Sequence, residues 1–135
     1  MKSNFCSLLL AAGISFFLLS CNEVTTGPQS GTGTAPPAFY LNQNYPNPFT
    51  DTTTIEYGVP SSGGSSSLVS VIVYNQFQER IQNLVYNTSH TAGSFKTKWF
   101  GDDTRGNKVP PGIYIIELKG YSPQAVVLRI TAIKK

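Results

Sequence analysis

The sequence has few of the residues on which catalytic and metal chemistry depends. Its 135 residues include one histidine, His90, and two cysteines, Cys6 and Cys21. A structural zinc site takes about four ligands, mostly His and Cys, so a His/Cys metal cluster is excluded. His90 lies in the polar run 87–91, which predicts an exposed turn, and no G-x-S-x-G nucleophile motif is present. The sequence therefore predicts a protein that is not an enzyme and that uses no cofactor.

Charge is also scarce. Charged residues make up 13% of the chain, and 10 basic against 7 acidic side chains give a net charge of +3. The charges are scattered, and Lys134-Lys135 is the only basic run after the N-terminal segment. Nucleic-acid-binding proteins show a basic patch or stripe, which is missing here. We therefore expect neither a nucleic acid nor a small molecule as the partner.

No hydrophobic run is long enough for a comfortable transmembrane helix, which needs about 20 apolar residues. The longest, Leu8–Leu19, follows the positive Lys2 and ends in Leu18-Leu19-Ser20-Cys21. This quartet resembles a bacterial lipobox, in which the cysteine thiol receives a diacylglyceryl group. The alternative is an ordinary secretory signal in which Cys21 is incidental. We predict a lipoprotein signal peptide over residues 1–20 and lipidation at Cys21.

The cysteine count agrees with a lipid anchor. Cys6 lies in the predicted signal peptide, so the mature chain would keep only Cys21 and make no internal disulfide. A lone thiol in an exported protein needs an explanation, and acylation supplies one. Several acyl chains on one residue give stable membrane anchoring. The predicted location is therefore the cell envelope, most simply the outer membrane.

A linker follows the cysteine. Residues 22–38, NEVTTGPQSGTGTAPPA, contain one aliphatic side chain and no aromatic one, so they cannot bury a core. Gly, Ser, Thr and Pro dominate, which is typical of a flexible tether. The predicted organisation is a signal peptide over 1–20, a lipidated cysteine with its linker over 21–38, and one folded domain over 39–135.

The predicted domain has the period of two that indicates β-strands, and no helical periodicity. In one segment, for example, Val69, Val71 and Val73 share a face. Before the strands, Leu41–Pro48 is expected to form an extended arm, with Tyr45, Phe49 and their prolines packed on the sheet. A groove for a partner is the alternative. The predicted strands are Thr53–Val59, Leu68–Tyr74, Glu79–Tyr86, Ser94–Phe100, Ile113–Lys119 and Ala125–Ile133. Six or seven short strands with turn-rich gaps predict an all-β sandwich.

The stretch Trp99–Leu118 organises the second half of the domain as strand, polar loop and strand. Trp99 is expected to fill the centre of the sandwich, with a ligand contact as the alternative. Asp102, Asp103 and Asn107 are expected to cap turns. A calcium site is the alternative, although the spacing lacks the terminal Glu of a calcium loop. Gly112 is expected to take a backbone angle that glycine tolerates best.

Three motifs in order carry a family resemblance over residues 40–135. They are Asn44-Tyr45-Pro46-Asn47-Pro48-Phe49 with Thr52–Ile55, then Val71–Asn75 leading to Ile81 and Leu84, and finally Trp99-Phe100-Gly101 with Asp103, Gly106, Val109, Gly112, Tyr114 and Leu118. The pattern resembles the immunoglobulin-like module of the flagellar hook-capping protein. It is also similar to the type A C-terminal sorting domains of type IX secretion cargo. Asn75, Gln78 and Phe100 depart from the family pattern, and Gln78 is expected to loosen its turn.

The resemblance implies a single immunoglobulin-like β-sandwich of about seven short strands. It also implies structural roles for Tyr45, Pro46, Asn47, Pro48, Phe49, Trp99, Gly101, Asp103, Gly106, Gly112 and Tyr114. The last strand is expected to be integral to the sandwich, whereas nothing in the pattern buries Lys134 and Lys135.

These observations favour a lipid-anchored cell-envelope protein whose sandwich is a structural or protein-interaction module. Its expected partners are the membrane, through the lipid, and other envelope or secretion-machinery proteins. A type IX sorting domain is the alternative, although only 17 residues separate Cys21 from Phe39, which leaves no cargo domain to deliver. A truncated cargo protein is a third possibility.

Overall fold

The alternation of apolar and polar side chains corresponds to seven β-strands in a computed structural model. The model describes residues 34–61, 66–121 and 124–135, so the predicted signal peptide, Cys21 and most of the linker lie outside the described residues. None of the described residues forms a helix long and apolar enough to cross a membrane. The strands are β1 (Tyr40–Leu41), β2 (Thr53–Val59), β3 (Ser67–Asn75), β4 (Arg80–His90), β5 (Gly93–Trp99), β6 (Gly112–Tyr121) and β7 (Ala125–Lys134). The predicted all-β fold is confirmed.

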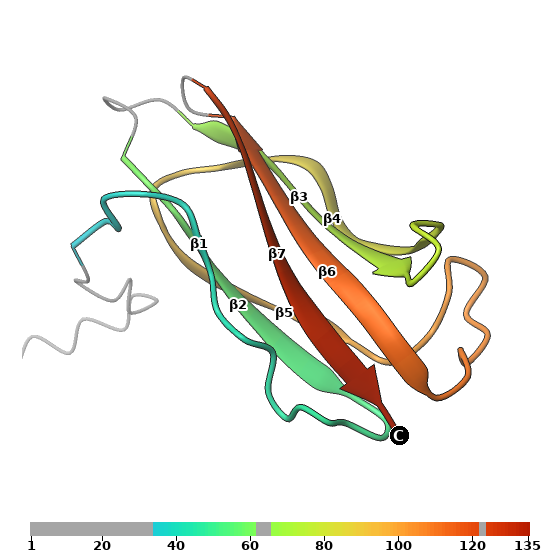
Figure 1. The fold of residues 1–135 in the computed structure, drawn as a ribbon. Coiled ribbons are helices and arrows are strands. Elements are labelled where there is room, and N and C mark those ends of the chain that lie inside the picture. Colours follow the sequence, from blue (N-terminus) through green and yellow to red (C-terminus); the bar gives the residue numbers. More distant parts are fainter. Residues whose placement is uncertain (1–33, 62–65, 122–123) are drawn as a thin grey trace, which may run out of the picture. The chain divides into compact units, whose positions relative to one another are not determined.

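The strands form two antiparallel sheets that face each other (Figure 1). One sheet has the order β1-β2-β5 and the other the order β4-β3-β6-β7. In immunoglobulin lettering, with β1 as A, β2 as B, β3 as C, β4 as C′, β5 as E, β6 as F and β7 as G, the sheets are A-B-E and C′-C-F-G. This is the arrangement of an immunoglobulin-like sandwich.

The core lies between the sheets, where alternate side chains of each strand meet. Trp99 is 0% exposed and is the largest of the fully buried side chains. From β7, Val126, Leu128 and Ile130 pack against the core, and β7 pairs with β6 over its whole length. The prediction that the last strand is integral to the sandwich is therefore confirmed. The buried apolar side chains that form the core cluster are Phe39, Phe49, Ile55, Tyr57, Val59, Val69, Val71, Val73, Trp99, Val109, Tyr114, Ile116, Leu118 and Ala132.

The prediction for His90 was wrong. β4 continues to His90 because its polar residues pair with β3, where Ser67 faces His90 and Val69 faces Thr88. Ladder hydrogen bonds need only main-chain groups, so a polar sequence does not end a strand. The His90 ring packs edge-on against Phe95, with ring centroids 4.3 Å apart, and its Nε2 is buried without a hydrogen-bond partner.

The two-residue strand β1 was not predicted. It is held by pairing with β2 and by two aromatic rings, each of which packs against the backbone of a glycine. The ring of Tyr40 occupies the space of a Cβ at Gly58, and the ring of Phe39 occupies that space at Gly120. Glycine is needed at both positions because the aromatic rings approach the backbone so closely.

Candidate interaction surface

The arm and the last strand are joined by hydrogen bonds at one end of the domain, near the C-terminus (Figure 1). Asn47 Nδ2 donates to the carbonyl of Thr131 at 2.9 Å, and Asn47 Oδ1 accepts from the N–H of Ile133 at 2.9 Å. The N–H of Phe49 donates to the carbonyl of Ile133, and the N–H of Lys135 donates to the carbonyl of Phe49. We call this joint of residues 47–49 with residues 131–135 the clasp.

Within the arm, hydrogen bonds of the buried Asn44 side chain hold a main chain that forms no regular strand. Its Nδ2 donates to Thr53 Oγ1 at 2.8 Å and to the Pro46 carbonyl at 3.3 Å. Thr53 Oγ1 also donates to the Pro46 carbonyl, so the polar atoms are paired. Phe49 is buried, but Tyr45 is 80% exposed, so the expectation that both aromatic residues pack on the sheet was wrong for Tyr45. The main chain at residue 45 pairs with β2, which turns the ring outwards. Pro46 and Pro48, both preceded by cis peptide bonds, are exposed.

Three aromatic residues of the family motifs, Phe49, Trp99 and Tyr114, pack against one another inside the same end of the sandwich. The Phe49 and Trp99 centroids lie 5.2 Å apart, and those of Trp99 and Tyr114 lie 5.0 Å apart. Trp99 Nε1 donates to the carbonyl of Asp102, and Tyr114 Oη donates to the carbonyl of Pro110 at 2.7 Å. The Tyr114 bond is the tyrosine corner of immunoglobulin-like domains, at the start of strand F. The structure thus places Trp99 in the core.

Asp103 shapes the loop between β5 and β6. Its Oδ1 accepts the N–H groups of Asn107 and Arg105, each at 2.9 Å, while Gly106 donates to its carbonyl. These bonds, led by the one from the Asn107 backbone, hold the pKa of Asp103 below its ordinary value. Gly106 has a φ of 84°, where glycine is favoured. Within the described ranges, no group of three or more His, Cys, Asp or Glu is placed to hold a metal ion.

The other two motif glycines differ from each other. Gly101 has a φ of 64°, where glycine is favoured, and a Cβ there would lie 2.7 Å from Lys134 Cε, a contact that a shift of that flexible side chain would relieve. Gly112 has a φ of 158°, at the border of extended backbone, and open space around it, so the expected demand for glycine is weak there. Lys134 was expected to lie unburied at the end of the domain. It is half-buried instead, because its aliphatic stem lies against Gly101.

The four-stranded sheet has an outer face, formed by the side chains of β3, β6 and β7 that point away from the core. Its rows follow from the strand register, which pairs Leu68 with Tyr121, Lys119 with Val127 and Glu117 with Arg129. Polar side chains are usual on such a face. Here five apolar side chains are 41–56% exposed: Leu68, Ile113, Tyr121, Val127 and Ile133.

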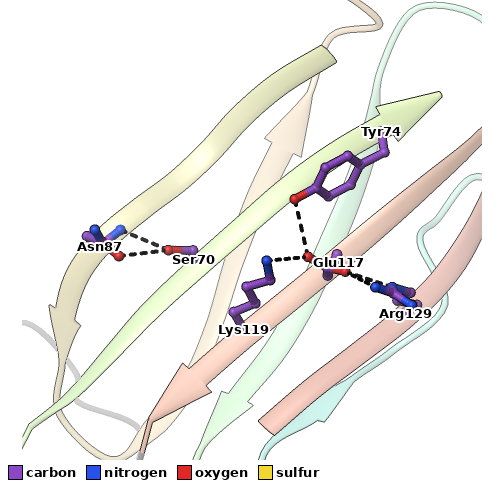
Figure 2. A network of polar contacts seen from close by, with 6 residues as sticks. All are labelled: Ser70, Tyr74, Asn87, Glu117, Lys119 and Arg129. Carbon is purple, nitrogen blue, oxygen red and sulfur yellow. Dashed lines mark hydrogen bonds and ion pairs between the residues drawn. The ribbon is translucent and has the colours of Figure 1, made fainter. Parts of the chain in front are cut away.

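A carboxylate is buried in the middle of this outer face (Figure 2). The Glu117 side chain is only 3% exposed because Tyr74, Lys119 and Arg129 lie around it. Arg129 Nε and Nη2 contact Glu117 Oε2 at 2.7 and 2.6 Å, while Lys119 Nζ and Tyr74 Oη lie 3.1 and 3.3 Å from Oε1. Burial acts to raise the pKa of Glu117, but the bonds from Lys119 and Arg129 outweigh it and lower that pKa.

Two hollows flank the turn between β3 and β4. The basic hollow, about 200 Å³, is lined by Tyr74, Gln78, Ile115 and Arg129. The end groove, about 250 Å³, lies on the other side of the turn. Its lining residues include Phe77, Ile81, Val109, Pro110, Pro111 and Ile113.

The turn itself is tight, contrary to the expectation for Gln78. Asn75 Oδ1 accepts the N–H groups of Phe77 and Glu79, each at 2.9 Å, and the Gln78 N–H donates to the Asn75 carbonyl. Gln78 accepts a φ of 65° to allow this closure. The side-chain bonds of Asn75 therefore close the turn, so a glycine is not needed for it.

The sequence analysis missed the pairing of Glu117 with Arg129. One signal for it exists: the two residues lie at matching positions of the β6–β7 hairpin, where opposite charges are often paired across strands. The contribution of Tyr74, 43 positions away in the chain, has no comparable local signal.

Comparisons with known proteins bear on the fold. The sequence matches no family model, and it matches no curated protein. Among solved structures, the chain is similar to part of PorU from Porphyromonas gingivalis, known from the crystal structure of its dimeric latent form. The match has a TM-score of 0.58 and 19% identity, and it covers 76% of this chain. The chain spans only about a tenth of PorU, with 10% of that chain covered, and at this identity the likeness shows the fold alone.

Proposed function

We propose that this chain is a lipid-anchored cell-envelope protein whose immunoglobulin-like sandwich is a non-catalytic protein-interaction module. The observation that carries the proposal is the outer face of the four-stranded sheet. Five large apolar side chains are exposed there, around the charged cluster of Glu117, Lys119 and Arg129. They form two groups, Ile113 with Ile133 at one end of the face and Leu68, Tyr121 and Val127 towards the other, and the charged cluster lies between them. Exposed apolar side chains with charged neighbours are typical of protein-binding surfaces.

The anchor is supported by the sequence alone. Leu18-Leu19-Ser20-Cys21 has the order and position of a lipobox, and residues 22–38 have the composition of a tether. A tethered domain would hold its outer face at a distance from the membrane, accessible to a second envelope protein.

A second function, a sorting domain of the type IX secretion route, is favoured by one comparison. Part of PorU shares this fold, and the motifs over residues 40–135 resemble the type A sorting domains of this route. In this case the module would be recognised by secretion machinery.

The anchor is tested with a Cys21→Ala variant in the native cells. We expect the variant to accumulate as a precursor and to lose labelling by a palmitate analogue. Fractionation and surface proteolysis of tagged protein then locate the wild type. Normal processing and labelling of the variant would reject the lipid anchor.

The interaction surface is tested separately by photo-crosslinking in cells. A crosslinking amino acid replaces Val127 on the outer face or, as a control, Lys96 on the three-stranded sheet. We expect a discrete crosslinked protein at position 127 and none at position 96. Equal crosslinking at both positions would remove the outer face as the specific surface. A crosslink to secretion machinery would favour the sorting-domain function.

A further inference from the structure

The two hollows beside the β3–β4 turn are close enough to hold one extended segment. Ile115 lines the basic hollow and Ile113 lines the end groove. They are successive outward residues of β6, so they lie about 7 Å apart along the strand. Two side chains on the same face of an extended peptide have the same spacing.

The charged cluster of Glu117, Lys119 and Arg129, which reaches the basic hollow through Arg129, is not neutral. Glu117 carries one negative charge, whereas Lys119 and Arg129 carry one positive charge each, which leaves one positive charge. The lowered pKa of Glu117 and the raised pKa of Lys119, due mainly to its bond with Glu117, keep these two side chains ionised, and a guanidinium stays charged in proteins. One further carboxylate would neutralise the cluster.

The donors needed for a second carboxylate are in place. A guanidinium has five N–H donors in a planar fork, and Glu117 takes those of Nε and Nη2 only. The Arg129 side chain is 64% exposed in spite of this pair. Gln78 adds a side-chain amide and Ile115 contributes an apolar wall, while the Tyr74 hydroxyl already donates to Glu117. Arginine with neutral donors is a common setting for carboxylate recognition.

We propose that the outer face binds an acidic segment of a partner protein, with an Asp or Glu carboxylate in the basic hollow. An apolar side chain of the same segment lies in the end groove, against Phe77, Pro110 and Ile113. Phe77 is 74% exposed at the tip of the turn, so a ligand would cover it. This inference rests on the proposed interaction module and specifies the chemistry of its partner.

The test uses the full chain purified in detergent and an array of blocked hexapeptides. Each peptide places one apolar residue two positions from Asp, Asn, Ser or Lys, with every apolar residue type represented. We expect the tightest Asp peptides to bind at least about tenfold more strongly than their Asn counterparts. On binding, NMR signals of the Arg129 Nε–H and the Gln78 side-chain amide should shift.

Two exchanges of Gln for Glu give a matched pair. Gln78→Glu puts a negative charge in the basic hollow and should weaken binding of the Asp peptides about tenfold. Gln124→Glu adds the same charge at the opposite end of the sheet, where Gln124 is exposed, and should leave binding unchanged. Phe77→Ser should weaken binding of Asp and Asn peptides alike, because it removes only the apolar contact.

The outcomes separate this inference from the proposed function. If no Asp peptide binds better than its Asn counterpart, or if Gln78→Glu has no effect, the acidic segment is rejected. Crosslinks at Val127 in cells would in that case still support the interaction module. If Asp peptides bind but no crosslink forms at Val127, the hollow has its proposed chemistry and the module lacks a partner under those conditions.

Discussion

Gln78 has a left-handed backbone conformation that the hydrogen bonds of its turn impose on it. The turn closes because Asn75 accepts two backbone N–H groups, and this closure holds Gln78 at a φ of 65°. A residue with a side chain loses about 1–2 kcal/mol in this left-handed region. Glycine avoids this loss but adds roughly 0.5–1 kcal/mol of backbone entropy.

Gln78→Gly should therefore stabilise the domain by up to about 1 kcal/mol, since the strain removed exceeds the entropy added. The free energy of unfolding, from denaturant titration, measures the change. Gln76→Gly is the control, because Gln76 lies in the same turn without a positive φ, and we expect it to be neutral or destabilising. A destabilised Gln78→Gly variant would show that the backbone at this position is not strained.

The protonation of His90 should make the free energy of unfolding depend on pH below about 6.5. Burial holds the pKa of His90 below its ordinary value of 6.5, against the rings of Tyr57 and Phe95. As the pH falls through this value, the unfolded chain takes up the proton first, so the folded state loses stability. Stability should be fully present above about pH 6.5 and should decrease as the pH falls towards the folded pKa.

A His90→Phe variant isolates this effect. Its unfolding midpoint in denaturant should stay constant between pH 7.5 and 5, whereas the wild-type midpoint should fall. Glu117 acts in a different window, because its lowered pKa preserves its contribution above its ordinary value of 4.5. An identical decline in both proteins would mean that another group titrates.

At the scale of the element, the clasp bonds main-chain groups at the free edge of β7, where a further strand would otherwise pair. The unpaired edge of a terminal strand exposes main-chain groups that invite aggregation. On β7, these groups at Thr131 and Ile133 are bonded by Asn47 and by the main chain at Phe49. The arm thus protects the end of the last strand without forming regular sheet.

Asn47→Ala should cost about 1–3 kcal/mol, because it removes two hydrogen bonds of about 0.5–1.5 kcal/mol each. Hydrogen exchange at the Ile133 amide should accelerate in parallel. Asn42→Ala on the same exposed arm should change stability by less than about 0.5 kcal/mol, since the bond at Asn42 uses its backbone N–H. Equal effects of the two variants would contradict a specific role of Asn47.

The period of two was enough to predict six of the strands and their buried faces, because main-chain geometry alone sets it. It was not enough for β1, which has two residues, or for residues 87–90 at the end of β4, where polar residues pair with β3. The contact of Tyr74 with Glu117 was also out of reach, although the pairing of Glu117 with Arg129 had a signal in the β6–β7 hairpin. It depends on a register between β3, β6 and β7 that local sequence does not specify.

For the whole molecule, β7 completes both the core and the outer face. Deleting residues 125–135 would expose Ile116 and Leu118 on one side and leave Glu117 without Arg129 on the other. A buried charge without its partner is strongly destabilising. We therefore expect the truncated chain to lose the dispersed NMR spectrum of a folded domain altogether.

The matched control keeps the backbone of the clasp. Lys134→Ala with Lys135→Ala removes two side chains but retains the main-chain bonds to Phe49, so the spectrum should stay dispersed. If the truncated chain instead kept a folded spectrum, β7 would be a detachable tail. Its loss would in that case affect only recognition.

The clasp also sets the order in which the molecule can be completed. A polypeptide emerges from the ribosome with its N-terminal residues first, so the arm is made before its partners, residues 131–135. Until then Asn47 and Phe49 have no partners for their hydrogen bonds in the clasp, and β6 lacks a neighbour on one side. A chain threaded through a translocation channel during this interval would still be unfolded, and the clasp would close only after residues 131–135 arrived.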